Sequence, residues 1–200
     1  MPGRLIVFEG VDGAGIETQA NMLVEYMTKK GSQVNKLSYP EYEHPIGNLI
    51  HEFLYRKFDI PAVTQTLLHL ADRSKDAEAI RRWLDEGKTV VSERYATSTM
   101  AYQGFLGFPV ENIVKITEMA GIPKPDIIIY LKISAETSVK RKRMEKTSLD
   151  RNEGDSKLMS DVGAFYEKLA EKNTFGKWVV IDGERSKEEV FDEVKKVLGF

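Results

Sequence analysis

Short runs of apolar residues alternate along this chain with longer segments in which apolar residues recur every three or four positions. The short runs are almost unbroken, which is typical of strands buried on both faces of a sheet. They predict strands over Arg4–Phe8, Gln33–Ser38, Lys88–Ser92, Asp126–Leu131 and Trp178–Ile181. The longer segments predict helices over Thr18–Lys30, Gly47–Tyr55, Pro61–Glu86, Thr97–Gln103, Glu111–Ala120, a stretch from about Ala135, Met159–Lys172 and Lys187–Leu198.

Five strands that alternate with helices indicate one parallel sheet covered on both faces, because parallel strands need a crossover between them. The 200 residues fit one ordinary domain, since domains commonly hold ~100–200 residues. We therefore expect a single α/β domain over residues 1–200. In such sheets ligands bind at the carboxyl ends of the strands, so residues that directly follow strands are the first candidates for a site.

The composition excludes several classes of protein. Lys and Arg number 29 against 31 Asp and Glu, a net charge of −2 that provides no overall basic field for nucleic acid or a membrane surface. The chain has no cysteine, which excludes disulfides and thiol catalysis. No apolar run approaches the ~18 residues of a membrane span. We expect a soluble, cytoplasmic protein whose partners include neither a nucleic-acid polymer nor a membrane.

A glycine-rich segment directly follows the first predicted strand and precedes the first predicted helix. Between a strand and a helix, glycines allow backbone N–H groups to surround an anion at the helix N-terminus. The segment therefore predicts a phosphate-binding loop. Its residues are Gly10, Val11, Asp12, Gly13, Ala14 and Gly15.

Two positions depart from the pattern G-x-x-x-x-G-K-[ST] of phosphate-binding loops. Ile16 stands where the pattern has a lysine, and Glu17 stands where it has a hydroxyl residue. The lysine normally contacts the β- and γ-phosphates, and the hydroxyl normally binds Mg²⁺. We expect the backbone cradle to persist with weakened charge chemistry. Glu17 is a candidate direct ligand of Mg²⁺, because carboxylates suit this ion.

A series of segments in the chain resembles the thymidylate kinase family of nucleoside-monophosphate kinases. The resemblance covers essentially the whole length, with the segments in the family's order and spacing. It implies a three-layer α/β/α fold with a five-stranded parallel sheet and a short lid at about 145–157. It also implies phosphoryl transfer from ATP to dTMP, giving dTDP and ADP. The matching segments are Phe8–Gly15, Thr18-Gln19, Tyr39-Pro40-Glu41, Ala71-Asp72-Arg73, Glu93-Arg94-Tyr95, Ala101–Gly104, Pro123–Asp126 and Leu149–Glu153.

The resemblance implies roles for residues around the acceptor phosphate and sugar. Asp12 would accept a hydrogen bond from the 3′-hydroxyl of dTMP, and Arg73 would contact its base and phosphate. Arg94 would bind the phosphate, to which its forked guanidinium is suited. Glu93 replaces the aspartate usual in the family and keeps a carboxylate that could hold Mg²⁺ through water.

The resemblance also implies which residues contact the base. Tyr102 and Gln103 would pack against the pyrimidine and hydrogen-bond to it. His69 stands where many members have a phenylalanine that stacks on thymine, so stacking is retained while selectivity is open. Tyr42 replaces a phosphate-binding arginine, which removes one cation near the acceptor phosphate.

An active enzyme with Ile16 needs cations from elsewhere, because phosphoryl transfer depends on stabilising the charge of the phosphate oxygens. Basic residues end the helix before the lid, at Lys140–Arg143. The resemblance implies that Arg141 stacks on adenine and that Arg143 and Arg151 are candidate catalytic arginines. Together with residues 10–17, Thr18 would belong to the ATP site.

The leading interpretation is therefore a dTMP kinase that uses ATP and Mg²⁺, and the family resemblance implies a homodimer. One alternative is a catalytically impaired paralogue that binds nucleotide without turnover, which Ile16 and Glu17 favour. A second alternative is a kinase of another pyrimidine nucleotide or nucleoside, which His69 and Tyr42 favour.

Overall fold

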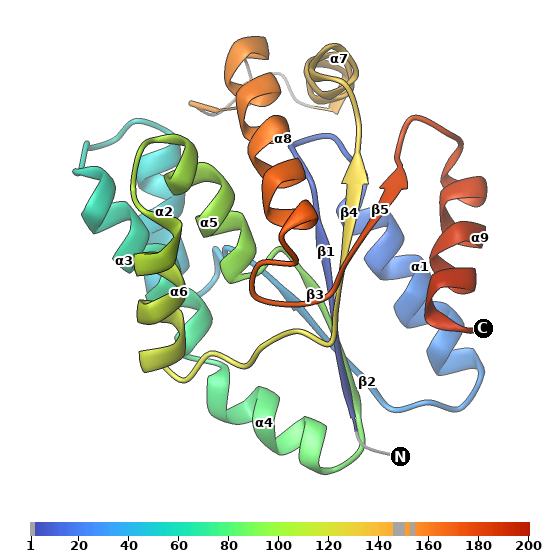
Figure 1. Cartoon of the computed structure of the whole chain (residues 1–200). Coiled ribbons are helices and arrows are strands. Elements are labelled where there is room, and N and C mark those ends of the chain that lie inside the picture. The colour runs from blue at the N-terminus through green and yellow to red at the C-terminus, as the bar shows by residue number, and fades with distance from the viewer. Residues whose placement is uncertain (1–2, 146–150, 153–154) are drawn as a thin grey trace.

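Strand β1 (Arg4–Glu9) lies at the centre of a five-stranded parallel sheet in the computed structural model of the chain, which describes residues 3–145, 151–152 and 155–200. The strand order is β2-β3-β1-β4-β5 (Figure 1). β1 and β4 are buried along most of their length, as their apolar sequences predict, whereas β2 at the sheet edge is partly exposed. The other strands are β2 (Val34–Ser38), β3 (Thr89–Glu93), β4 (Ile127–Lys132) and β5 (Trp178–Asp182).

Helices cover both faces of the sheet and complete three layers (Figure 1). α1 (Ile16–Lys29) and α9 (Lys187–Leu198) pack together on one face, and α5 (Ala96–Phe105) and α8 (Ser156–Glu171) pack together on the other. The remaining helices are α2 (Pro45–Leu54), α3 (Ala62–Ser74), α4 (Ala77–Asp85), α6 (Val110–Met119) and α7 (Ala135–Glu145). α2, α3 and α6 lie on the outer side of α5, and α7 follows the end of β4 (Figure 1).

The predicted three-layer α/β/α fold is confirmed, and the ends of each predicted strand are shifted by no more than about one residue. The last helix, α9, has its predicted bounds for a local reason. Ser186 and Glu189 form a capping box at its start, and Gly199 ends it in the left-handed conformation.

One predicted helix is wrong: residues 61–86 form α3 and α4 with a break at Lys75 and Asp76 rather than one continuous helix. The side chains at the break bind elsewhere in the fold. The hydroxyl of Tyr39 donates to Asp76 Oδ2 at 2.8 Å, and Lys75 contacts Glu41 at 2.8 Å. These tertiary contacts override a helical pattern that apolar spacing alone would continue.

The parallel register brings the carboxyl ends of three strands to the same edge of the sheet. Glu93 at the end of β3 pairs with Phe8 of β1 on one side and with Ser38 of β2 on the other. The segments that follow β1, β2 and β3 therefore leave the sheet side by side, which is the position where a site is expected in this fold class.

Most of the predicted lid, residues 146–150 and 153–154, lies outside the described residues. Its described part includes Arg151 and Asn152, and Asp155 caps the start of α8 through hydrogen bonds from Lys157 N and Leu158 N. In the part of the chain that the structure describes, no helix has both the length and the apolar character needed to cross a membrane.

Candidate active site

The segment Gly10–Gly15, which we call the phosphate loop, joins β1 to α1 in the predicted order of strand, loop and helix. Gly13 and Gly15 have φ values of 78° and 85°, which side chains other than glycine rarely adopt. Gly15 directly precedes α1, and no side chain caps the helix there. The first N–H groups of α1 are therefore left to an anion, which the positive end of the helix dipole also favours.

A pocket of about 580 Å³ lies between the phosphate loop, the ends of β2 and β3, and helices α2, α3 and α5. Most of the predicted site residues line it, although they come from segments far apart in the chain. The structure therefore brings the predicted phosphate and acceptor residues to one cavity. These lining residues are Asp12, Gly13, Gly15, Ile16, Glu17, Thr18, Tyr42, His69, Arg73, Glu93, Arg94, Tyr102, Gln103 and Arg151.

The other predicted residues of the ATP site, Arg141 and three residues of the loop itself, do not line the pocket. Arg141 on α7 donates from Nη1 to the carbonyl of Gly13 at 3.1 Å and from Nη2 to the carbonyl of Gly183 at 3.2 Å. Its guanidinium thus lies against the phosphate loop, and its stacking on adenine stays a prediction. The loop residues that are buried rather than pocket-lining are Gly10, Val11 and Ala14.

The basic end of α7 has a different orientation from the one predicted. Arg143 is exposed and is not among the described residues that line the pocket, so its catalytic role stays a prediction without support from the geometry. Lys142, which precedes it, is half-buried and lines the pocket. The sequence predicts no separate role for Lys142, which belongs to the basic run Lys140–Arg143.

Arg94 follows β3 and reaches the phosphate loop. Its guanidinium donates to the carboxylate of Asp12 and, from Nη1, to the carbonyl of Gly10 at 3.1 Å. The hydroxyl of Tyr102 donates to the other carboxylate oxygen of Asp12 at 3.3 Å. Burial opposes the charge of Arg94, but Asp12, Tyr102, Tyr166 and Glu9 together outweigh burial and raise the pKa of the guanidinium. Arg94 also has a φ of 59°, a strained conformation that is concentrated at functional sites.

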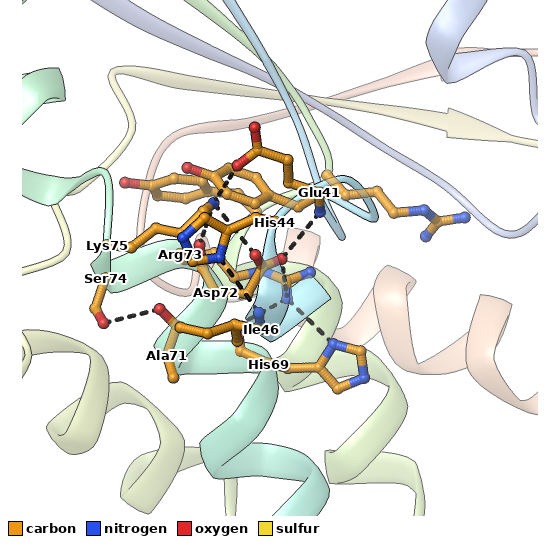
Figure 2. Close-up of polar contacts among 12 residues, drawn as sticks. Glu41, His44, Ile46, His69, Ala71, Asp72, Arg73, Ser74 and Lys75 are labelled. Carbon is orange, nitrogen blue, oxygen red and sulfur yellow. Dashed lines mark hydrogen bonds and ion pairs between the residues drawn. The ribbon is translucent and has the colours of Figure 1, made fainter. Parts of the chain in front are cut away.

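Arg73 lies in the last turn of α3, rather than in the middle of a longer helix, and is only 1% exposed. Its Nη1 donates to the carbonyl of His69 at 2.7 Å and contacts His69 Nδ1 at 3.1 Å (Figure 2). A guanidinium has no acceptor, so Nδ1 is the acceptor and the proton of the neutral imidazole is on Nε2. Burial, together with the charges of Arg73 and Arg94, lowers the pKa of His69 to about 3.

Asp72 and Lys75 join the end of α3 to the segment after β2 (Figure 2). Asp72 Oδ2 accepts a hydrogen bond from the backbone N–H of Glu41 at 3.2 Å, and Lys75 Nζ lies 3.2 Å from Asp72 Oδ1. Burial opposes the charge of Lys75, but its hydrogen bonds to Asp76 and Glu41, together with the charges of Asp72 and Asp76, outweigh burial and raise the pKa of Lys75. Because Arg73 directly follows Asp72 in the same helical turn, this network also fixes the position of Arg73.

The two predicted ligands of Mg²⁺, Glu17 and Glu93, both line the pocket. Glu17 is exposed in the first turn of α1, while the 7% exposed Glu93 contacts Lys36 and accepts a hydrogen bond from Ser38 Oγ at 2.8 Å. Among residues 3–145, 151–152 and 155–200, no three His, Cys, Asp or Glu side chains form a metal cluster. Nucleotide-bound Mg²⁺ needs only one or two carboxylates besides phosphate oxygens and water, so this donor set fits an ion that arrives with a nucleotide.

Glu9, at the end of β1, is a buried residue directly before the phosphate loop for which the sequence predicts no role. It is fully buried and accepts hydrogen bonds from Tyr95 N at 3.0 Å, Thr97 Oγ1 at 2.5 Å, Ser98 Oγ at 2.6 Å and Tyr166 Oη at 2.9 Å. These contacts hold the start of the phosphate loop against α5 and α8. An acidic residue that ends a buried strand and precedes a glycine-rich loop is the signal that could have identified it.

Gln65 is a second missed residue, and its Oε1 accepts a hydrogen bond from Gln103 Nε2 at 3.2 Å. It lines the pocket from α3 together with His69 and Arg73, at the four-residue spacing that places side chains on one face of a helix. Five pocket residues contribute a buried polar atom without a hydrogen-bond partner among the described residues. These atoms are Arg73 Nε, Glu93 Oε1, Thr99 Oγ1, Gln103 Oε1 and Arg151 Nε.

Arg151 lines the pocket from the predicted lid and binds the segment between α2 and α3. It donates from Nη1 to Asp59 Oδ1 at 3.0 Å and from Nη2 to the carbonyl of Phe58 at 3.3 Å. Its guanidinium lies over the ring of Phe53, 3.7 Å from the ring centre. These contacts hold the guanidinium against α2, and its catalytic role stays a prediction.

Comparison with known proteins identifies relatives of this chain in sequence and in structure. The family model described as thymidylate kinase matches residues 8–194. A thymidylate kinase of Fervidobacterium nodosum is 36% identical over 197 residues, covering 96% of this chain and 97% of the relative, and that of Homo sapiens is 31% identical over 193 residues, covering 96% and 88%. A solved thymidylate kinase from Candida albicans has a TM-score of 0.79 at 22% identity, covering 99% of this chain and 92% of that one, which supports the fold.

Proposed function

The chain belongs to the thymidylate kinase family, and we propose that its pocket transfers the γ-phosphoryl group of ATP, bound with Mg²⁺, to dTMP. In this reaction a phosphate oxygen of dTMP forms a bond to the γ-phosphorus. The bond from that phosphorus to the oxygen bridging it to the β-phosphorus breaks, and its electron pair stays on the ADP oxygen. The products are dTDP and ADP.

The contact between Asp12 and Arg94 supports this assignment most directly. Asp12 belongs to the phosphate loop, and Arg94 is the residue expected to bind the acceptor phosphate. If Arg94 binds the acceptor phosphate, the pair would bring the donor and acceptor sides within one hydrogen bond of each other. Phosphoryl transfer depends mainly on such positioning and on electrostatic stabilisation, because little covalent chemistry is left to the protein.

The donor end is formed by the phosphate loop and the start of α1. Its backbone N–H groups would bind the phosphates, as the glycine conformations and the uncapped helix allow. Glu17 and Glu93 would hold Mg²⁺, directly or through water. The ion, when bound, neutralises phosphate charge that these two carboxylates would otherwise repel.

The acceptor end is formed by α3 and α5. Arg73 would donate to the base and phosphate of dTMP, and Tyr102 would pack against the pyrimidine. The polar atoms of Gln103 and Thr99 that have no partner among the described residues would be satisfied by the base. His69 would contact the base with its imidazole, with the ring nitrogen Nδ1 already engaged by Arg73.

A coupled assay of ADP release with dTMP, dUMP, UMP and thymidine as acceptors tests the proposed function. We expect turnover with dTMP at a higher kcat/KM than with the other acceptors. A higher kcat/KM with UMP or thymidine would contradict the acceptor assignment. Binding of ATP without turnover of any acceptor would instead support a paralogue that has lost catalysis.

We also propose that the protein is a cytoplasmic homodimer. Val63 and Leu67 on α3 are 48% and 49% exposed, and Leu49 on the adjacent α2 is 46% exposed. A second copy of the chain would bury these apolar side chains. Sedimentation should give a dimer for the native chain and a monomer for Leu67→Glu, whereas a native monomer at micromolar concentration contradicts the assembly. Cell fractionation tests the cytoplasmic location, which we infer from the proposed use of ATP and dTMP as substrates.

A further inference from the structure

The donor end of the pocket lacks the cation that phosphate-binding loops normally supply. From Gly10 to Thr18 the chain has no Lys or Arg, and it has two carboxylates, Asp12 and Glu17. Ile16, at the position of the usual lysine, lines the pocket. The charge that would develop on the β- and γ-phosphates therefore needs a cation from another part of the fold.

Helix α7 is fastened directly onto the phosphate loop. Ser138 Oγ donates to the carbonyl of Asp12 at 2.5 Å, and Arg141 donates to the carbonyl of Gly13 at 3.1 Å. The packing is so close that a Cβ atom on Gly13 would lie 2.9 Å from the carbonyl oxygen of Ser138. The position of α7 over the loop is thus fixed at two points, three residues apart on the helix.

The spacing along α7 directs one further basic residue to the same face. Lys142 is four residues after Ser138 and therefore shares the loop-facing side of the helix with Ser138 and Arg141. Burial agrees with this phase, because Ser138 is buried and Arg141 and Lys142 are half-buried, whereas Lys140 and Arg143 are exposed. Lys142 lines the same pocket as Ile16 and Glu17.

Each of the four Lys and Arg residues that line the described part of the pocket, Lys142 included, has contacts with other residues of the chain. Arg94 binds Asp12 and the carbonyl of Gly10, and Arg73 binds His69 at the acceptor end. Arg151 binds the segment between α2 and α3. Lys142 is carried by the helix that contacts the phosphate loop itself.

We propose that the ammonium group of Lys142 binds the β- and γ-phosphates of ATP and replaces the lysine that Ile16 has displaced. Lys142 is then a further catalytic residue, supplied by α7 rather than by the loop, and it stabilises charge without accepting or donating a proton. This role rests on the proposed phosphoryl transfer from ATP.

Three variants test the role of Lys142. Lys142→Ala should lower kcat with dTMP by about 10²–10³-fold, as for loss of one preorganised charge stabiliser, and should weaken binding of ATP with Mg²⁺ in calorimetry. Lys142→Arg should keep most of the activity. Lys140→Ala, which removes an exposed lysine from the same helix, is the matched control. It should change kcat with dTMP and the affinity for ATP with Mg²⁺ by no more than about twofold.

A rescue experiment separates a catalytic role from a structural one. Ile16→Lys should raise kcat at least tenfold in the Lys142→Ala background. It should raise kcat by a smaller factor in the native background, because the two lysines bind the same phosphates. Equal gains in both backgrounds, or a Lys142→Ala variant that matches Lys140→Ala, would overturn the proposal. If the native protein shows no turnover of dTMP, the proposed function fails, and weakened ATP binding in Lys142→Ala still decides the role of Lys142.

Discussion

Arg94 and Asp12 are 82 positions apart in the chain, yet both line the pocket and the guanidinium of one donates directly to the carboxylate of the other. The same guanidinium also binds the carbonyl of Gly10. Arg94 thus links the end of β3 to the phosphate loop, and in the proposed reaction this contact would position the two substrates relative to each other.

Substitution of Arg94 should disrupt catalysis more than folding. We expect Arg94→Ala to lower kcat/KM for dTMP by about 10²–10³-fold, because a preorganised charge and a forked donor are lost together. Arg94→Lys keeps the charge without the fork and should be intermediate. Steady-state kinetics measures both, with Arg82→Ala on the exposed side of α4 as the control. A kcat/KM near the native value for Arg94→Ala contradicts a phosphate-binding role.

Binding of ATP should depend steeply on Mg²⁺, because Glu17 places a carboxylate at the donor end of the pocket. Without the ion this carboxylate repels the triphosphate, and with it the carboxylate becomes a ligand. Glu17→Gln should reduce the ratio of ATP affinities with and without Mg²⁺ by about tenfold, or ~1.4 kcal/mol. Titration calorimetry measures the ratio, and Glu25→Gln, further along α1, is the control. Equal ATP affinities with and without Mg²⁺ in the native protein would disprove this dependence.

His69 should make the stability of the fold depend on pH in the acidic range. Burial and the nearby charges of Arg73 and Arg94 lower its pKa to about 3 in the folded state, against ~6.5 when unfolded. Between these values the unfolded state binds more protons, so the free energy of unfolding falls as pH decreases. From pH 7 to pH 4.5, His69→Phe should lose less stability than the native protein, by up to about 2 kcal/mol.

Urea unfolding at the two pH values measures this difference. Equal losses in the native protein and His69→Phe would mean that the imidazole titrates normally in the folded state. Because neutral His69 accepts from Arg73, His69→Phe should also raise KM for dTMP more than it lowers kcat.

Loss of the Glu9 carboxylate should destabilise the whole domain. Glu9→Ala leaves four buried donors without their acceptor and should lower the free energy of unfolding by about 3–5 kcal/mol, the range for breaking a buried charged network. Glu9→Gln, which keeps one acceptor, should cost less. Glu171→Ala at the exposed end of α8 should change stability by no more than about 0.5 kcal/mol. A Glu9→Ala variant as stable as this control would show that the carboxylate contributes little.

The sequence predicts the sheet well because its strands are recognisable from local information. Residues 5–8 and 127–131 are almost continuously apolar, and a strand buried on both faces needs nothing else to be identified. The break between α3 and α4 could not be predicted in this way. It depends on Lys75 and Asp76 binding Glu41 and Tyr39, which are distant in the chain.

The same distinction applies to the site. Arg94 and the phosphate loop follow predicted strands, so the rule that ligands bind at strand ends identifies both. Whether Lys142 or Arg143 lines the pocket depends on how α7 is rotated about its axis over the loop. Apolar spacing cannot predict this rotation, because the end of α7 is rich in charged residues. The contacts of Ser138 and Arg141 set it instead.

The burial of Glu9 also has a consequence for the thermodynamics of nucleotide binding. Its hydrogen bonds to α5 and α8 order the residue that directly precedes the phosphate loop as part of folding itself. The conformational entropy of that segment is therefore lost before any nucleotide arrives, and association need not supply it again. A loop organised in this way can retain useful affinity for a polyphosphate even though its own side chains contribute no positive charge.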